Sequence, residues 1–250
     1  MTDDRVYGRN PVLALLRSGG RRADEIAVLA GAHGPLGEVV ALARQAGVKV
    51  SFRTREQLTA IAGTDGHQGV VARVAAAAYH DLDDLLAIPA ARGAAPFFLV
   101  LDRVQDPRNF GAILRTGEVF GVHGVVVPKH HQVGLTDVAA HAAMGAMEHL
   151  PVARETNLVS ALERLKQSGI WVYGSAVEGG VPPWQIDLTG PLCLVVGGEG
   201  EGVRPLVART CDGLLTIPMV GAIGSLNVGA AVAALCYEAA RQRRTSRSGT

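Results

Sequence analysis

The sequence predicts an α/β protein with two domains: a small N-terminal α/β domain and a larger C-terminal domain built on a mostly parallel sheet. The chain has 250 residues, which is enough to bury two separate cores. Short apolar runs of strand length alternate with helical patterns along most of the chain. An acidic segment that contains prolines interrupts this alternation. We therefore expect one domain at residues 1–78, a linker at 79–95 and a second domain at 96–250.

The N-terminal domain is expected to alternate helices with strands. Asn10 followed by Pro11 predicts a helix, because a capping residue before a proline is typical of a helix start. Thr54 and Gln57 have the spacing of a capping box and predict another helix. The remaining predicted features are helix stops at Gly19-Gly20 and Gly47, a helix at 36–46, and strands at 25–30, 48–52 and 68–75.

The C-terminal domain shows a second series of the same kind, after a linker that holds at most one short helix near residues 82–86. The predicted strands are 97–101, 124–127, 170–173, 192–196 and 213–217. The predicted helices are 111–120, 137–147, 158–167 and 226–242, the last ending with Arg241, Arg243 and Arg244. Strands that alternate with helices imply a mostly parallel sheet with helices on both faces.

Composition excludes several classes of protein. Hydrophobic residues make up 48% and charged residues 19%, the opposite of a disordered chain. The longest bulky apolar stretches are far shorter than the ~20 residues that a membrane span needs, and no signal peptide is expected. Three cysteines without CxxC spacing exclude a disulfide scaffold and a zinc ribbon. We therefore expect a cytoplasmic protein without metal and without a membrane partner.

The net charge of +1 conceals an uneven distribution. Residues 1–80 carry 10 Lys/Arg against 7 Asp/Glu, whereas residues 93–240 carry 9 against 13. The last ten residues carry four arginines and no acid. A polyanion that binds the N-terminal part is compatible with this pattern, but an ordinary solvated surface explains the charge equally well.

Glycine-rich segments follow three predicted strands, at residues 173–175, 197–202 and 218–225. In parallel sheets, ligands bind at the carboxyl ends of strands. Three such ends predict a pocket in which backbone groups hold a ligand. The chain has no GxGxxG between a strand and a helix, no GxxxxGK[ST] and no HExxH, so the usual dehydrogenase, P-loop and zinc-protease sites are not supported.

Two polar residues stand out in the segment DPRNFGAILRT. Asn109 has the position of a cap for the helix that follows, and a capping role is as well supported as a functional one. Arg115 is the one cation on an otherwise apolar stretch of helix. It either extends into solvent or, if it faces the glycine-rich loops, offers its guanidinium to a phosphate or an oxyanion.

Three motifs resemble those of the SpoU family of bacterial RNA 2′-O-methyltransferases, within the SPOUT superfamily. They are DRVQDPRNFGAILRTGEVFG, LVVGGEGEGVRPLV and IPMVGAIGSLNVGAAVAALCYEAARQR, in this order. The N-terminal YGRNPVLALL and GHQGVVARV resemble the accessory RNA-binding domain of that family, which is related to a ribosomal protein. The resemblance implies S-adenosyl-L-methionine as methyl donor, a homodimer, and a C-terminal trefoil knot whose loops hold the cofactor.

The resemblance also implies the site residues. Those that match the polar catalytic set are Asn109, Arg115, Glu199, Ser225 and Asn227. Those that match the cofactor site are Gly174, Gly197, Ile217, Ser225 and Leu226. Gly224 and Gly229 stand where many relatives carry serine.

Two expectations follow for altered chains. Enlarging Gly197 should block the cofactor site and leave the fold largely intact. A chain that starts near Ala95 should still fold, dimerise and bind the cofactor, and should lose most of its affinity for RNA.

The implied reaction is methylation of a ribose 2′-hydroxyl in RNA. The separate N-terminal domain favours a guanosine of 23S ribosomal RNA as the substrate. Transfer RNA, and a ribosomal RNA modification that confers antibiotic resistance, are the alternatives within this activity. A non-catalytic RNA-binding protein and another nucleotide-dependent α/β enzyme are the alternatives of a different class.

Overall fold

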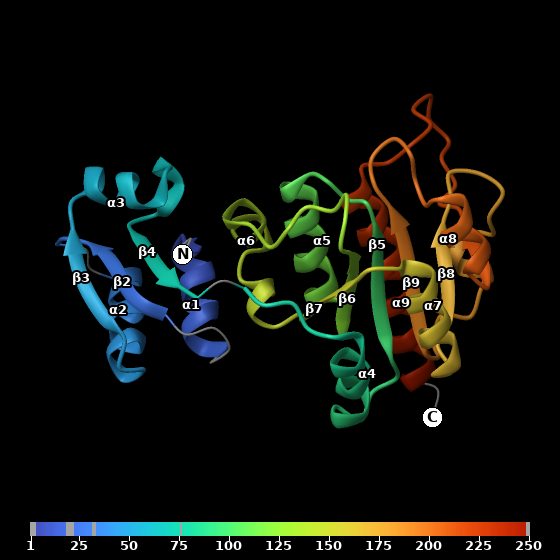
Figure 1. Cartoon of the computed structure of the whole chain (residues 1–250), viewed down its shortest axis with the longest axis horizontal. Helices are drawn as coiled ribbons and strands as arrows, with labels where there is room; N and C mark the ends of the chain where they lie inside the picture. Colours follow the sequence, from blue (N-terminus) through green and yellow to red (C-terminus); the bar gives the residue numbers. More distant parts are fainter. Residues whose placement is uncertain (1–3, 19–22, 32–33, 76, 249–250) are drawn as a thin grey trace. The chain divides into compact units, whose positions relative to one another are not determined.

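The computed structural model describes residues 4–18, 23–31, 34–75 and 77–248, which form two compact units (Figure 1). The first unit comprises the described residues of 1–78 together with 134–149. The second unit comprises 79–133 and the described residues from 150 onward. The expected stop at Gly19-Gly20 lies outside the described residues.

The first unit is built on a four-stranded mixed sheet with the order β1-β4-β2-β3. β2 runs parallel to β3, and β4 runs antiparallel to both β1 and β2. The strands are β1 (Asp4–Tyr7), β2 (Ala23–Leu29), β3 (Lys49–Arg53) and β4 (Val70–Val74). The helices are α1 (Arg9–Ser18), α2 (Pro35–Gln45), α3 (Arg55–Ala62) and the short 3-10 helix η1 (Asp65–His67). The capping box is confirmed, because Thr54 and Gln57 exchange side-chain-to-backbone hydrogen bonds at the start of α3.

The two faces of this sheet are covered differently (Figure 1). Alternate side chains of all four strands pack with α1 and α2 in the larger core of the unit. On the opposite face, α3 packs Leu58 against Ala27 and Val71, which form a second and smaller cluster. α1 and α2 therefore cover most of one face, and α3 covers only part of the other.

A later segment of the chain completes the first unit. The sequence predicts one helix at 137–147, but Met144 and Gly145 both have positive φ angles and divide it into α6 (Asp137–Ala143) and η2 (Ala146–Glu148). The rings of Tyr7 and His141 stack with their centroids 4.5 Å apart. A Cβ on Gly145 would overlap the side chain of Ala14, so only glycine permits this approach to α1.

The second unit confirms the expected parallel sheet. Its six strands have the order β10-β8-β9-β5-β6-β7, and every pairing is parallel. The strands are β5 (Phe97–Asp102), β6 (Gly124–Pro128), β7 (Val152–Glu155), β8 (Trp171–Ser175), β9 (Leu192–Gly197) and β10 (Gly213–Leu215). The helices are α4 (Leu82–Ala91), α5 (Pro107–Val119), α7 (Leu158–Gln167), η3 (Pro183–Gln185), α8 (Pro205–Thr210) and α9 (Val228–Ser248).

Helices cover both faces of this sheet. Residues of α4, α7 and α8 share one core with the strands, whereas α5 and α9 pack against each other on the opposite face. No helix in the described part of the chain is long and apolar enough to cross a membrane.

α9 is longer than predicted, and Arg243 therefore lies inside the helix instead of at its end. Its guanidinium donates hydrogen bonds to the carbonyls of Pro96 at 3.0 Å and Gly190 at 2.7 Å, and lies over the ring of Phe97 at 4.7 Å. Arg243 thus holds α9 against the segments that precede β5 and β9 through these hydrogen bonds.

Residues 79–95, expected as a linker, contain helix α4 and belong to the second unit. Leu82 and Leu85 are fully buried and pack in one core with Phe98 and Val126. A Cβ on Gly124 would overlap the side chain of Leu85, which shows how closely α4 approaches β6. The acidic residues of this segment define the start of a helix: Asp81 and Asp84 form a capping box.

We predict that Leu85→Ala lowers the free energy of unfolding by about 2–5 kcal/mol, because it opens a cavity in a closed core. Leu206→Ala is the matched control: Leu206 is 58% exposed on α8, so its loss should change stability by less than about 0.5 kcal/mol. Urea unfolding of both variants measures the difference. Equal effects would contradict the placement of α4 in the core.

Candidate functional site

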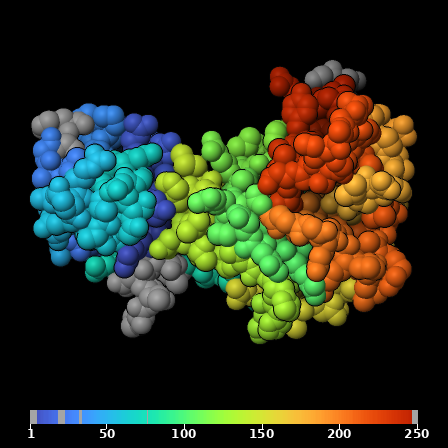
Figure 2. All heavy atoms as spheres, turned by 90° about the horizontal axis from the view of Figure 1, so that it is seen from above, coloured from blue at the N-terminus to red at the C-terminus, as the bar shows by residue number. Residues whose placement is uncertain are grey.

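The three glycine-rich strand ends meet at one end of the second unit, as expected. β10, β8 and β9 are neighbours in the sheet, and the segments that follow them enclose a cavity of about 680 Å³. Figure 1 shows these loops at the carboxyl ends of the strands, and Figure 2 looks onto the same end of the unit. The lining residues include Ser175, Gly197, Glu199, Gly202, Ile217, Met219, Ser225, Leu226, Asn227 and Val228.

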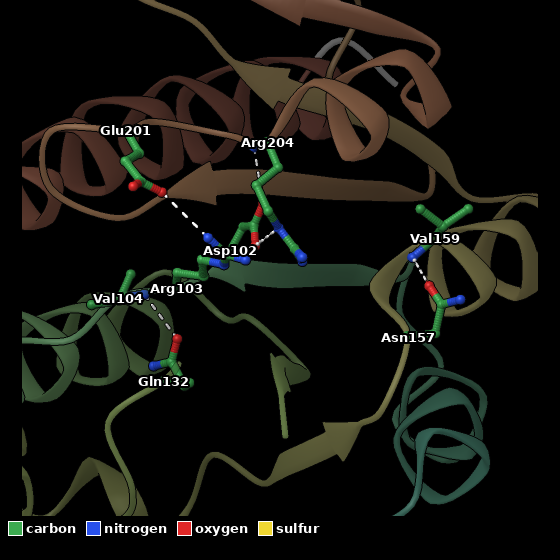
Figure 3. A network of polar contacts seen from close by, with 8 residues as sticks. All are labelled: Asp102, Arg103, Val104, Gln132, Asn157, Val159, Glu201 and Arg204. Carbon is green, nitrogen blue, oxygen red and sulfur yellow. Dashed lines mark hydrogen bonds and ion pairs between the residues drawn. The ribbon is translucent and has the colours of Figure 1, made fainter. Parts of the chain in front are cut away.

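Asp102 anchors the loop that follows β9 (Figure 3). Its carboxylate is fully buried and accepts hydrogen bonds from Nε of Arg204, at 2.8 and 3.0 Å, and from the backbone N–H of Arg204 at 3.0 Å. The carbonyl of Asp102 also accepts from the backbone N–H of Gly198 at 2.8 Å. One residue at the end of β5 therefore holds both ends of the loop 198–204.

The main chain at Gly197 and Gly198 lies very close to other main-chain segments. A Cβ on Gly197 would overlap the carbonyl group of Gly202, and a Cβ on Gly198 would overlap the carbonyl oxygen of Arg103. The obstacle in both cases is backbone, which cannot rotate away. The expectation that enlarging Gly197 leaves the fold largely intact is therefore wrong, because a side chain there overlaps the main chain of Gly202.

Glu199 and Glu201 have different partners. Nδ2 of Asn109 donates a hydrogen bond to Oε1 of Glu199. Glu201 instead forms an ion pair with Arg103, with 3.4 Å between the two side chains (Figure 3). Since Glu201 is largely exposed, that pair contributes little stability. Of the two glutamates, Glu199, which matches the polar catalytic set of the family, is thus the one that contacts Asn109.

A chain of polar contacts joins three segments at the rim of the cavity. Nδ2 of Asn227 donates to Oδ1 of Asn109 at 3.0 Å, and Asn109 in turn donates to Glu199. Oδ1 of Asn227 accepts from the backbone N–H of Gly229 at 2.9 Å, which caps the start of α9. Because both polar atoms of the Asn109 amide are used, the orientation of its side chain is fixed.

The capping role considered for Asn109 belongs to Asp106. α5 begins at Pro107, and the carboxylate of Asp106 accepts hydrogen bonds from the backbone N–H groups of Arg108 at 2.7 Å and Asn109 at 3.0 Å. Asn109 lies inside the first turn of the helix, so its side chain is available for Glu199 and Asn227.

Three of the expected site residues do not line the cavity: Gly174, Arg115 and Asn109, the last of which contacts the lining residues Glu199 and Asn227. Gly174 is buried in β8, where a Cβ would contact Leu214 and Cys211, and its neighbour Ser175 lines the cavity instead. Arg115 is exposed on α5, does not line the cavity, and forms no hydrogen bond or ion pair with any described residue. The expected residues Ile217, Ser225, Leu226 and Asn227 all line it.

The side chains at the cavity suit an organic ligand. No group of three or more His, Cys, Asp or Glu residues with metal-binding geometry occurs within the described ranges. Burial raises the pKa of Cys211 to about 11 and that of Cys236 to about 12, so both thiols stay protonated near neutral pH. The cavity combines apolar walls with a few polar groups, which is typical of cofactor pockets.

Sequence reasoning did not identify Asp102 and Arg204. Asp102 could have been found, because a carboxylate that closes the apolar run FFLVLD has to meet a partner where the strand ends. Arg204 gives no such signal, since its partner Asp102 lies 102 residues away in the sequence.

Comparisons with known proteins agree with this geometry. Residues 96–237 match the SpoU rRNA Methylase family, and residues 5–80 match the family described as RNA 2′-O ribose methyltransferase substrate binding. The chain is 41% identical to the 23S rRNA (guanosine-2′-O-)-methyltransferase RlmB of Shewanella oneidensis, covering 97% of this chain and 98% of that protein. It is 42% identical to RlmB of Ralstonia nicotianae, covering 95% of each.

Solved structures show the same fold. The SpoU methyltransferase AviRb from Streptomyces viridochromogenes, in complex with the cofactor AdoMet, is 25% identical and superimposes with a TM-score of 0.80. The match covers 96% of this chain and 90% of AviRb. Both halves of the sequence, the parallel sheet and the cavity at its strand ends thus lead to one conclusion: the chain belongs to the SpoU rRNA methylase family.

Proposed function

We propose that this protein transfers a methyl group from S-adenosylmethionine to the 2′-hydroxyl of a guanosine in 23S ribosomal RNA. The observation that carries this proposal is the chain of contacts Glu199–Asn109–Asn227, two of whose members line the cavity. Relatives at 41% and 42% identity, matched over nearly their whole length, are named for this reaction.

The cavity suits S-adenosylmethionine. Its volume of about 680 Å³ lies within the range of small-ligand pockets, roughly 300–1,000 Å³. Ile217, Leu226 and Val228 supply apolar walls for a flat base, and Ser225 and the backbone of the glycine-rich loops supply polar contacts. When bound, the cofactor supplies a methyl group on a positively charged sulfur, a good leaving group that needs no metal.

The polar residues at the rim have separate tasks in this proposal. Glu199 and Asn227 hold the Asn109 amide in one orientation, so that the amide can position the ribose beside the cavity. A guanidinium keeps its proton at any ordinary pH. Arg115 therefore acts as a cation that binds a phosphate of the target nucleotide and stabilises negative charge on the ribose oxygen.

The homodimer is also part of the proposal. Ala112, Arg115 and Val119 follow one another on the exposed face of α5, and Val119 is 65% exposed. On α9, Tyr237 is 60% exposed and its ring meets that of Phe120 edge to face, with centroids 6.3 Å apart. A second copy that covers this apolar surface would bring Arg115 into the interface.

Two further features follow from membership of the family and are proposed with it. The first is a trefoil knot formed by the C-terminal part of the second unit. The second is a cytoplasmic location, where ribosomal RNA is available.

The decisive experiment is methyl transfer from labelled S-adenosylmethionine to a 23S ribosomal RNA transcript, with mass mapping of the product. We predict a single 2′-O-methylguanosine, and a loss of turnover of about 10²-fold or more in Asn109→Ala, because a positioning contact is removed. The melting temperature should change little, since Asp106 and not Asn109 caps α5. Methylation of transfer RNA alone, or no transfer to any RNA, would contradict the proposed substrate or activity.

We predict that Gly197→Ala abolishes binding of S-adenosylmethionine, because the new Cβ overlaps the main chain at Gly202 and displaces the loop. Gly190→Ala is the matched control: it changes a glycine outside the loops of the cavity, and its Cβ would meet nothing within 4 Å. Calorimetry in the presence of a chelator measures both variants. If Gly197→Ala binds S-adenosylmethionine with the affinity of the unaltered protein, the close approach of Gly197 to Gly202 is contradicted. If binding requires a divalent ion, the proposal of a metal-free site is contradicted.

We predict that light scattering gives twice the chain mass of 26.1 kDa, and that Tyr237→Asp shifts the protein toward the monomer. A charge at this position would have to be buried between two copies, which is unfavourable. Trp184→Asp serves as control, since Trp184 is 58% exposed elsewhere on the second unit and should leave the dimer unchanged. A monomeric unaltered protein at micromolar concentration would exclude the dimer.

A further inference from the structure

The strand register of the first unit brings basic side chains into one row. Arg5 of β1 pairs with Arg73 of β4, Arg73 also pairs with Glu25 of β2, and Glu25 pairs with Lys49 of β3. Paired residues point to the same side of a sheet. Arg53 lies four residues after Lys49 and therefore joins the same side. We call this row, Arg5, Arg73, Glu25, Lys49 and Arg53, the basic face.

The basic face lies on the side of the sheet opposite α1 and α2. The neighbours of these residues in each strand, such as Val6, Ile26 and Val74, point the other way into the core with those helices. α3 covers the part of the sheet around Ala27 and Val71 and leaves the row beside it uncovered. Arg5, Lys49 and Arg73 are accordingly exposed.

The charges of the basic face are poorly balanced. Four of its five side chains are cations, and Glu25 is the single acid among them. The Ser51 hydroxyl lowers the pKa of Glu25 most, and the charges of Lys49, Arg53 and Arg73 lower it further. At the β1 edge of the sheet, Oδ1 of Asp137 accepts a hydrogen bond from the backbone N–H of Arg5 at 3.3 Å. Arg53 forms an ion pair with Glu25, with 3.6 Å between the side chains. Arg5 and Arg73 lie directly opposite each other, and like charges in that position repel, so an anion that binds beside them would lower the repulsion.

A hollow of about 310 Å³ lies beside two of these cations. Arg5 and Arg73 line it together with Ala60 and Ile61 of α3 and Val71 of β4. Nη1 of Arg5 donates to the carbonyl of Ile61 at 2.6 Å, which fixes the guanidinium at the edge of the hollow. No aromatic side chain lines it, so stacking of bases does not provide binding here.

From these observations we infer that the basic face binds the phosphate backbone of a folded segment of the substrate RNA. The cations contact successive phosphates across the sheet, and the hollow beside Arg5 and Arg73 accepts the sugar and phosphate of one nucleotide. Phosphate contacts fix register and orientation without reading sequence. This inference rests on the proposed function, because it takes the partner to be the RNA that the second unit methylates.

The test compares two double variants with the same change in charge. Lys49→Gln/Arg73→Gln removes two cations from the basic face, whereas Arg17→Gln/Arg44→Gln removes two from α1 and α2 on the other side of the unit. Filter binding of a 23S ribosomal RNA fragment over a salt series gives the slope of log K against log salt. The first variant should reduce the slope by about 1.4–1.8, because each of the two lost phosphate contacts contributes roughly 0.7–0.9. The control should reduce it by less than about 0.5.

Glu25→Gln provides a test with the opposite sign. It removes the single acid of the basic face and should tighten RNA binding and steepen the salt slope by up to about one contact. A variant that merely damaged the fold could not bind RNA more tightly. The far-ultraviolet circular dichroism spectrum should be unchanged in all three variants and serves as the check on folding, because the altered residues lie in the first unit.

The outcomes separate this inference from the proposed function. Suppose that the unaltered protein methylates 23S ribosomal RNA and that both double variants reduce the slope of log K against log salt equally. The basic face is then not the RNA-binding surface, and the proposed function still stands. A Glu25→Gln variant that binds RNA more weakly also overturns the inference. If the unaltered protein neither binds nor methylates the RNA, the proposed function itself fails.

Discussion

The carboxylate of Asp102 is the contact on which the rest of the candidate site depends. It is buried at the end of β5, and Arg204 neutralises it with both side chain and backbone donors. A buried carboxylate that loses its partner costs roughly 3–5 kcal/mol, and less here because 35% of the Arg204 side chain remains exposed. The pair therefore defines one position for the loop 198–204.

The positions of the candidate site residues depend on that loop. Glu199 lies in this loop and accepts a hydrogen bond from the side chain of Asn109. Asn109 in turn accepts a hydrogen bond from Asn227, and Asn227 caps the start of α9. A displacement of the loop would thus reach the first turn of α5 and the first turn of α9. The absence of side chains at Gly197 and Gly198 is what lets the loop pass so close to the strand ends. Glycine is needed at these two positions because two backbone segments approach closely. A positive φ angle is not the reason, since neither Gly197 nor Gly198 has one.

Local signals explain what the sequence could predict. The parallel sheet follows from short apolar strands between helices, and the meeting of the glycine-rich ends follows from the common direction of β8, β9 and β10. The capping box at Thr54 is equally local. The contact between Asn109 and Glu199 was reachable only through a family motif, because the two residues are 90 positions apart. The role of Asp106 was missed because α5 begins at Pro107, about one turn before the predicted start at residue 111.

Tertiary packing decided the features that sequence patterns could not. The acidic segment 79–95 has the composition of a linker, but two leucines one turn apart, Leu82 and Leu85, are enough to hold α4 in a core. The segment 134–149 lies within the C-terminal motif series, yet α6 and η2 pack with α1 and β1. No periodicity in a single sequence indicates which of two cores an apolar helix face will join.

The two units are consequently joined by more than one passage of the chain. It leaves the first unit after residue 78, returns at 134 and leaves again after 149. The expectation that a chain starting near Ala95 folds as a complete second domain is therefore not supported by this arrangement. Such a chain lacks α4, whose leucines fill the core beside Phe98, and it exposes the face of α6 that His141 presents to Tyr7. The segment 134–149 is therefore both an insertion in the sequence of the second unit and a structural part of the first unit.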